Sequence, residues 1–139
     1  MLVFGTANPE GFGGQDYGGV YLTDKDIRSM VPSMVGVPIK IEHKGRDVGK
    51  VVSAWQHDGR MDVVFEIDNQ SIEAALASRF VAGGYCKELS LGYKVEMTRS
   101  NTGQLSAQNK RVVELSLVKQ GARDNCKIRG FQTRHKVLI

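Results

Sequence analysis

Apolar and polar residues alternate in the segment 87–95, where two leucines, a tyrosine and a valine are separated by polar residues and glycine. A period of two over these nine residues predicts a strand with one buried face. Ser90 then points away from that face, with no bulky neighbour at Gly92. The segment 112–118 repeats the pattern and leaves Glu114 on its polar side. If the two strands lie near each other, a hydroxyl and a carboxylate share one surface.

Shorter patterns elsewhere in the chain predict further strands and a first helix. Strands are expected at residues 2–4, 37–43, 48–55, 61–67 and 126–131. A helix is expected at 24–30, because Thr23 is a good N-cap and the residue before Pro32 disfavours helical backbone. These elements are short and closely spaced, as in small β proteins.

A second helix is expected at 70–82, with Asn69 as its N-cap and the glycine pair 83–84 at its end. Four apolar residues form one stripe along it: Ile72, Ala75, Leu76 and Phe80. A stripe with this spacing is typical of a helix that packs against a core. We therefore expect this side of the helix to be buried.

The pattern as a whole predicts a mostly β fold with two or more short helices, a small and mainly antiparallel β-barrel. Residues 98–109 are rich in serine, asparagine and glutamine, and are expected to form an exposed, mobile loop. One domain is expected over residues 1–139. Within it, 1–18 would be a glycine-rich strand and loop, and 132–139 a basic tail.

Composition narrows the function classes. Hydrophobic residues make up 41% of the 139 residues and charged residues 24%, which is ordinary for a soluble globular protein. No apolar run approaches the roughly 20 residues that cross a bilayer, so no membrane association is expected. Cys86 and Cys126 are expected to be reduced thiols in an intracellular compartment. No motif predicts a cofactor or a metal site.

The net charge of +4 is unevenly distributed. From Lys110 onward there are eight lysines and arginines against two acidic residues. A basic C-terminal third can bind nucleic acid or an acidic protein, and it can equally be a solvated surface. Nucleic-acid binding is therefore left open.

A hydroxyl and a carboxylate become a hydrolytic site when a histidine lies between them. The imidazole takes the proton of the hydroxyl, and the carboxylate holds the imidazole in the correct tautomer. The chain has three histidines. His57 falls on an Asp-Gly hairpin turn and is expected to be solvated, and His135 lies in the basic tail with no carboxylate nearby in sequence. His43 falls at the end of a predicted strand.

Three motifs resemble those of viral capsid maturation proteases. Residues 37–43 (VPIKIEH) followed by 48–51 (VGKV) resemble the "pro-ile-x-ile-acidic-His … val-gly-x-val" stretch of the herpesvirus proteases called assemblins. Residues 89–93 (LSLGY) are similar to the "leu-ser-ile-gly-tyr" strand of prohead proteases from tailed bacteriophages. Residues 114–118 (ELSLV), followed by Ala122, resemble the phage "glu-val-ser-leu-val … pro-ala-asn" segment. The resemblance covers roughly residues 19–128.

The resemblance implies a serine endopeptidase with the barrel fold of the herpesvirus and prohead proteases. It would cleave scaffolding protein inside the immature viral capsid in the infected cell. By motif match, Ser90 is the nucleophile and His43 the general base. The third member is a histidine in assemblins and an acidic residue in the phage proteins, so Glu114 agrees with the phage group. Ser116 lies on the same polar side of its strand and is a rival hydroxyl without a motif match.

The resemblance also implies an oxyanion hole in the predicted turn at 121–125. Gly121 and Arg123 match the first and third positions of the assemblin Gly-Arg-Arg turn, and Ala122 replaces the first arginine. That position works through its backbone N–H, which alanine keeps. Cleavage after small residues is implied for the substrate. Self-processing and homo-oligomer formation stay open, as does the alternative of a non-catalytic β-barrel that binds nucleic acid or the capsid.

Overall fold

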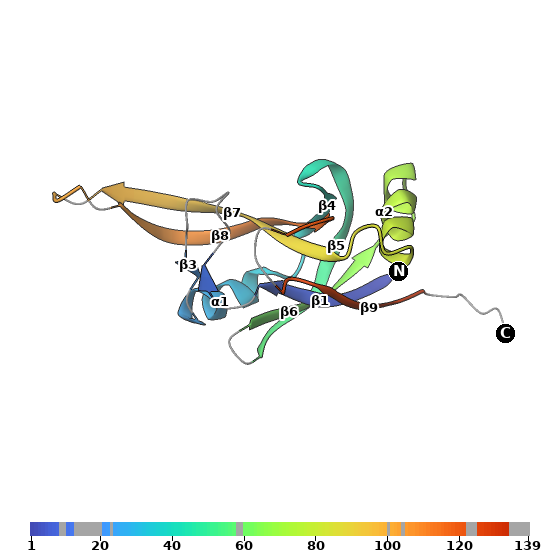
Figure 1. Ribbon diagram of the computed structural model, residues 1–139, viewed down its shortest axis with the longest axis horizontal. Helices are drawn as coiled ribbons and strands as arrows, with labels where there is room; N and C mark the ends of the chain where they lie inside the picture. Colours follow the sequence, from blue (N-terminus) through green and yellow to red (C-terminus); the bar gives the residue numbers. More distant parts are fainter. Residues whose placement is uncertain are drawn as a thin grey trace.

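The computed structural model describes residues 1–8, 11–12, 21–22, 24–57, 60–99, 101–103, 105–121 and 125–133. Within these ranges the chain is mostly β, with two α-helices (Figure 1). The elements are β1 (Leu2–Asn8), β2 (Gly11–Phe12), β3 (Tyr21–Leu22), α1 (Asp24–Met30), a 3-10 turn (Val31–Ser33), β4 (Pro38–Ile41), β5 (Lys44–His57), β6 (Arg60–Ile67), α2 (Ile72–Ala82), β7 (Glu88–Arg99), β8 (Leu105–Val118) and β9 (Ile128–Gln132). This confirms the predicted fold class.

Seven of the described strands form one sheet in the order β7-β8-β4-β5-β6-β1-β9, and β2 pairs with β3 separately. Most neighbours are antiparallel, as predicted, but β4 and β8 pair in parallel. In that pair, Ile39 lies beside Leu115 and Ile41 beside Leu117. Parallel neighbours need a long crossover connection, here residues 42–104. No local pattern predicts such a contact.

The sheet curls so that its two edge strands meet. The N–H of Leu89 donates to the carbonyl of Cys126 (2.8 Å), and the N–H of Ile128 donates to the carbonyl of Lys87 (2.9 Å). These bonds join the start of β7 to the segment that enters β9. They close one end of the sheet into a barrel-like shape, which reduces the exposed edge that an open sheet would leave.

The alternation predicted for β7 is present in the structure. Leu89 and Leu91 are buried in the core, together with Leu115 and Leu117 of β8. Ser90 therefore points to the other face of the sheet, as expected from the two-residue period. That face is also covered at this point, since only 6% of Ser90 is exposed.

Helix α2 differs from its prediction in two ways. Its N-cap is Ser71, whose hydroxyl accepts a hydrogen bond from the N–H of Ala74 (3.0 Å), and not Asn69. The expected apolar stripe is only partly buried: Ile72 is 85% exposed and Leu76 is 43% exposed, whereas Phe80 packs against the core. The buried residues of the helix are Ala74, Ala77 and Val81. Small residues on the inner face let the helix approach the sheet closely. The free energy of this close packing outweighs what would be gained by burying the larger apolar side chains on the outside.

The mobile loop expected at 98–109 was also wrong. Strand β7 continues to Arg99 and β8 begins at Leu105, and the two pair across the segment as a long hairpin. Backbone pairing satisfies the N–H and C=O groups of both strands whatever the side chains are, so a polar sequence can form such a ribbon. The described part of the chain contains no helix long and apolar enough to cross a membrane.

Candidate active site

A sharp turn after β4 positions His43. The strand ends at Ile41, two residues earlier than predicted, and both Glu42 (φ 51°) and His43 (φ 59°) adopt the left-handed backbone region. That region costs a residue other than glycine roughly 1–2 kcal/mol. Two hydrogen bonds to β8 hold the turn: the N–H of Glu42 donates to the carbonyl of Leu117 (3.0 Å), and the N–H of His43 donates to the hydroxyl of Ser116 (2.9 Å).

The register between β7 and β8 brings Ser90 and Glu114 to one face. Ser90 lies opposite Ser116, and Gly92 lies opposite Glu114. A side chain at Gly92 would occupy the place of the carboxylate, because a Cβ there would lie 2.1 Å from Glu114 Oε1. The glycine therefore leaves the space that lets the carboxylate lean across the neighbouring strand.

The imidazole of His43 joins these two side chains. Its Nε2 lies 3.0 Å from the hydroxyl oxygen of Ser90, and its Nδ1 contacts Oε1 of Glu114. The carboxylate and the hydroxyl are almost buried, whereas the side chain of His43 is 34% exposed. A Ser-His-Glu arrangement of this kind can activate the hydroxyl as a nucleophile, and the exposed edge of the imidazole leaves the site open to solvent on one side.

Ser116 binds both of the groups that orient the imidazole. Its hydroxyl donates to Oε2 of Glu114 (2.6 Å) and accepts from the backbone N–H of His43 (2.9 Å). The side chain of Ser116 is fully buried, and both of its hydrogen-bond partners are groups of the protein. From the sequence, Ser116 was predicted only as a rival hydroxyl to Ser90. Its position two residues after Glu114 on the same strand was the available signal, but the contact with His43 depends on the parallel pairing of β4 and β8.

Replacing Ser116 with alanine is expected to lower the rate of catalysis at this site about 10- to 100-fold, by analogy with the loss on removing a group that orients a metal ligand. The substitution removes one hydrogen bond from the carboxylate and leaves the N–H of His43 without its acceptor. A fall in kcat with little change in KM, measured on a peptide substrate, would agree with a positioning role. Exposed Ser53 on β5 gives a matched control, since Ser53→Ala should keep the full rate. Unchanged kcat in Ser116→Ala would show that these two hydrogen bonds are dispensable for catalysis.

Of the three residues predicted for the oxyanion hole, the structure describes only Gly121. The N–H of Gly121 donates to the Glu88 carboxylate (2.9 Å), so it is already engaged. Ala122 and Arg123 lie outside the described residues, and the predicted oxyanion hole stays a prediction. His57 is an exposed residue at the end of β5, and His135 also lies outside the described residues.

The cysteines are not competing nucleophiles. Cys86 and Cys126 are both buried and unbridged. Burial raises the pKa of the Cys86 thiol, and the negative charge of nearby Glu42 adds to the effect. The thiol therefore stays neutral at pH 7, and a neutral thiol is a weak nucleophile. Among the described residues, no three His, Cys, Asp or Glu side chains are grouped as a metal site.

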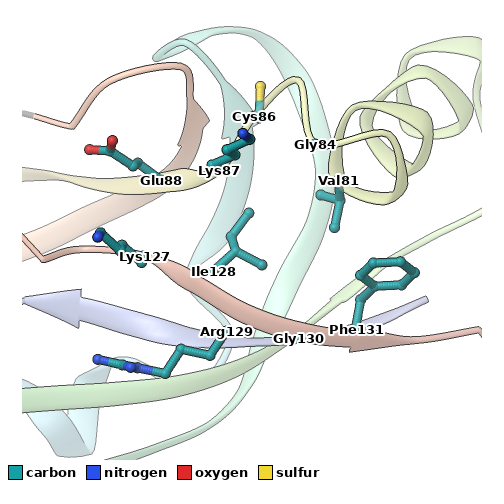
Figure 2. Close-up of a pocket in the computed structure, with 10 residues that line it drawn as sticks. All are labelled: Val81, Gly84, Cys86, Lys87, Glu88, Lys127, Ile128, Arg129, Gly130 and Phe131. Atoms are coloured by element: carbon teal, nitrogen blue, oxygen red, sulfur yellow. The ribbon is translucent and has the colours of Figure 1, made fainter.

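Two pockets adjoin the start of β7, two to five residues before Ser90. The first has a volume of about 470 Å³ and lies between the end of α2, the start of β7 and β9 (Figure 2). Val81, Ile128 and Phe131 give it apolar walls, and Lys87 lies beside them. The second, of about 480 Å³, includes Glu42, the residue before His43. Ser90, His43 and Glu114 line neither of these two pockets.

Comparison of the chain with protein-family models found no match. Searches of curated proteins and of solved structures also found no match. Any assignment of function therefore depends on the short motifs of the sequence and on the geometry of the site.

Proposed function

We propose that this protein is a serine endopeptidase with Ser90 as the nucleophile, His43 as the general base and Glu114 as the acidic partner. The observation that carries the proposal is a single imidazole whose two nitrogens contact a hydroxyl and a carboxylate. Order along the chain does not matter for such a triad, because unrelated folds reach the same geometry. The side chain of His43 is 34% exposed, and its exposed edge is the side from which a substrate would approach.

The chemistry proceeds in two stages. In acylation, the Ser90 oxygen attacks the scissile carbonyl while Nε2 of His43 accepts the hydroxyl proton, and the protonated imidazole then gives that proton to the leaving amine. In deacylation, water takes the place of the amine, and Nε2 removes its proton as it attacks the acyl-enzyme. The ester bond to Ser90 then breaks, and the imidazolium returns the proton to the Ser90 oxygen as the acid product leaves. Glu114 stabilises the imidazolium in both stages, and Ser116 keeps the carboxylate oriented toward Nδ1.

The developing oxyanion needs N–H donors, and losing one typically costs about 10²- to 10³-fold in rate. Since the N–H of Gly121 is bonded to Glu88, the backbone N–H of Ala122 is the proposed donor, with Arg123 acting through water. This part of the proposal comes from the resemblance to assemblins. It predicts that the rate of cleavage depends on the backbone N–H at position 122 and much less on the side chain there.

The substrate also follows from the resemblance. We infer that the enzyme cleaves a capsid scaffolding protein after small residues during virion morphogenesis, inside the immature capsid. Cleavage of its own chain is a further expectation of the same kind. Incubation of the purified protein with a library of unfolded peptides, followed by mass spectrometry of the new ends, would reveal the preferred residue.

A fluorophosphonate probe tests the nucleophile directly. We expect the purified protein to be labelled once, on Ser90, because an activated serine attacks the phosphorus and an ordinary serine does not. Labelling should disappear in Ser90→Ala and persist in Ser53→Ala, which is the same substitution at an exposed serine. The site is identified by mass spectrometry of the digested protein. Absence of labelling in the folded wild-type chain would argue for a barrel that binds without catalysis.

A further inference from the structure

The chain turns back toward β7 directly after β8 ends. Val118, the last residue of β8, lies opposite Glu88 of β7. Three residues later, the N–H of Gly121 donates a hydrogen bond to the side-chain carboxylate of the same Glu88 (2.9 Å). An extended chain would have moved about 10 Å beyond Val118 in three residues. The bond therefore holds the chain that leaves β8 beside the start of β7, two residues before Ser90.

The segment that begins at Gly121 also returns to the same part of β7. The carbonyl of Cys126 accepts a hydrogen bond from the N–H of Leu89 (2.8 Å), which is the residue before Ser90. Both described ends of the segment 121–126 are thus bound to neighbouring residues of one strand. One bond uses the backbone of β7, and the other uses the side chain of Glu88.

A third bond ties the chain after β8 to the turn that carries the general base. The N–H of Lys119 donates to Oε1 of Glu42 (2.9 Å), the residue before His43. Two carboxylates thus bind alternate N–H groups of the stretch 119–121. One belongs to the strand of the proposed nucleophile, and the other belongs to the turn of the proposed base.

Glu88 is directed to the face of the sheet that carries the hydroxyl. Glu88 and Ser90 lie two residues apart, and the pairing of β7 with β8 is regular between them, so their side chains share one face. The hydroxyl of Ser90 meets the imidazole of His43 on this face. Figure 2 shows the carboxylate of Glu88 directed away from Ile128 and Phe131, the apolar residues of the neighbouring pocket.

We propose that Glu88 is a positioning residue, whose carboxylate holds the segment beginning at Gly121 beside Ser90 so that its backbone can stabilise the oxyanion. The inference rests on the proposed peptidase function and specifies the side chain that fixes the oxyanion-binding segment. Donors of this kind lower the barrier because they are already oriented before charge develops. Without the anchor, the donors stay in the chain but lose their fixed orientation, and the rate falls although the nucleophile is intact.

Removal of the Glu88 carboxylate tests this role. Glu88→Ala is expected to lower kcat for peptide cleavage at least about tenfold, but by less than the loss of about 10²- to 10³-fold that follows removal of a whole oxyanion donor. KM should change little, because the oxyanion develops only in the transition state. Glu73→Ala, at an exposed carboxylate of α2, is the matched control and should have the wild-type kcat.

Two conservative variants separate the hydrogen bond from the charge. Glu88→Gln keeps an acceptor oxygen for the N–H of Gly121, and its kcat should stay within about threefold of wild type, since a neutral acceptor forms a weaker bond. Glu88→Asp keeps the charge but is one methylene shorter, so it should lose activity as Glu88→Ala does. It also provides a second test if the alanine variant does not fold, which thermal unfolding shows.

Two further measurements distinguish positioning from other effects. The kcat–pH profiles of Glu88→Ala and Glu88→Gln should have the same midpoint, because both lack the charge of Glu88 and both keep the contact between His43 and Glu114. Hydrogen–deuterium exchange at the N–H of Gly121, followed by NMR, needs no catalysis. It should be at least about tenfold faster in Glu88→Ala than in wild type, and close to wild type in Glu88→Gln.

Several results would overturn the proposal. A wild-type kcat in both Glu88→Ala and Glu88→Asp would do so, as would equal losses in Glu88→Ala and Glu88→Gln. Unchanged exchange at Gly121 in Glu88→Ala would show that the carboxylate does not hold the segment. Cleavage that depends on Ser90 but not on Glu88 would remove only the role of Glu88. A folded wild-type chain that neither cleaves peptides nor reacts with the fluorophosphonate probe would overturn the peptidase proposal and this role together.

Discussion

Ser90→Ala is expected to lower the rate of peptide-bond cleavage by about 10⁴- to 10⁶-fold, the loss seen when a serine protease loses its nucleophile. The hydroxyl of Ser90 contacts Nε2 of His43, and alanine removes it without adding volume. The fold should be unaffected, because the core contacts of β7 come from Leu89 and Leu91. Initial rates on a scaffold-derived peptide, read by chromatography, and a thermal unfolding curve measure the two effects.

Ser53→Ala serves as the matched control for this experiment, since it deletes a hydroxyl at an exposed position of β5. It should retain the wild-type rate. Full cleavage activity in Ser90→Ala would refute the assignment of the nucleophile. The same activity combined with loss in Ser116→Ala would transfer the role to the buried hydroxyl.

Glu114→Gln is expected to lower kcat by about 10³- to 10⁴-fold, the scale found when the carboxylate of such a triad becomes an amide. Both oxygens of Glu114 accept hydrogen bonds, Oε1 on the side of His43 and Oε2 from the hydroxyl of Ser116. An amide has only one acceptor oxygen. If that oxygen faces Ser116, the NH₂ group faces Nδ1 and holds the imidazole in the tautomer whose Nε2 already carries a proton. If it faces Nδ1, the hydroxyl of Ser116 loses its acceptor.

The double variant Glu114→Gln/Ser116→Ala separates these two cases. Without the hydroxyl, the amide oxygen is free to face Nδ1, and part of the lost rate should return. Steady-state kinetics would show the change in kcat, with KM nearly constant because Glu114 does not reach the substrate. Glu73→Gln, at a carboxylate whose side chain is 54% exposed, is the control and should have the wild-type rate. A wild-type kcat in Glu114→Gln would remove this residue from the proposed mechanism.

The local elements were largely predictable. The two-residue period of 87–95 and 112–118 predicted the buried leucines of β7 and β8, and Gly83 and Gly84 ended α2 as expected. Such features follow from neighbouring residues alone, because strand and helix periodicity are properties of short segments. Ser90, His43 and Glu114 were named from strand patterns and from motifs that resemble capsid maturation proteases. Their contact is now observed, and their catalytic role stays a prediction.

Other features depended on contacts that no short segment contains. Which side of α2 is buried was decided by how closely the sheet accepts Ala74 and Ala77, so the stripe at Ile72 and Leu76 was assigned to the wrong side. The hairpin at 98–109 required a partner strand for its backbone groups.

Periodicity thus determined the faces of the strands and the polar character of the surface that carries Ser90 and Glu114. The parallel pairing of β4 with β8, between segments about 75 residues apart along the chain, was decided only in three dimensions. That pairing lets Ser116 hold His43 and Glu114 together. The physical reason is that side-chain alternation is local, whereas the choice of a neighbouring strand depends on the free energy of the whole closed sheet.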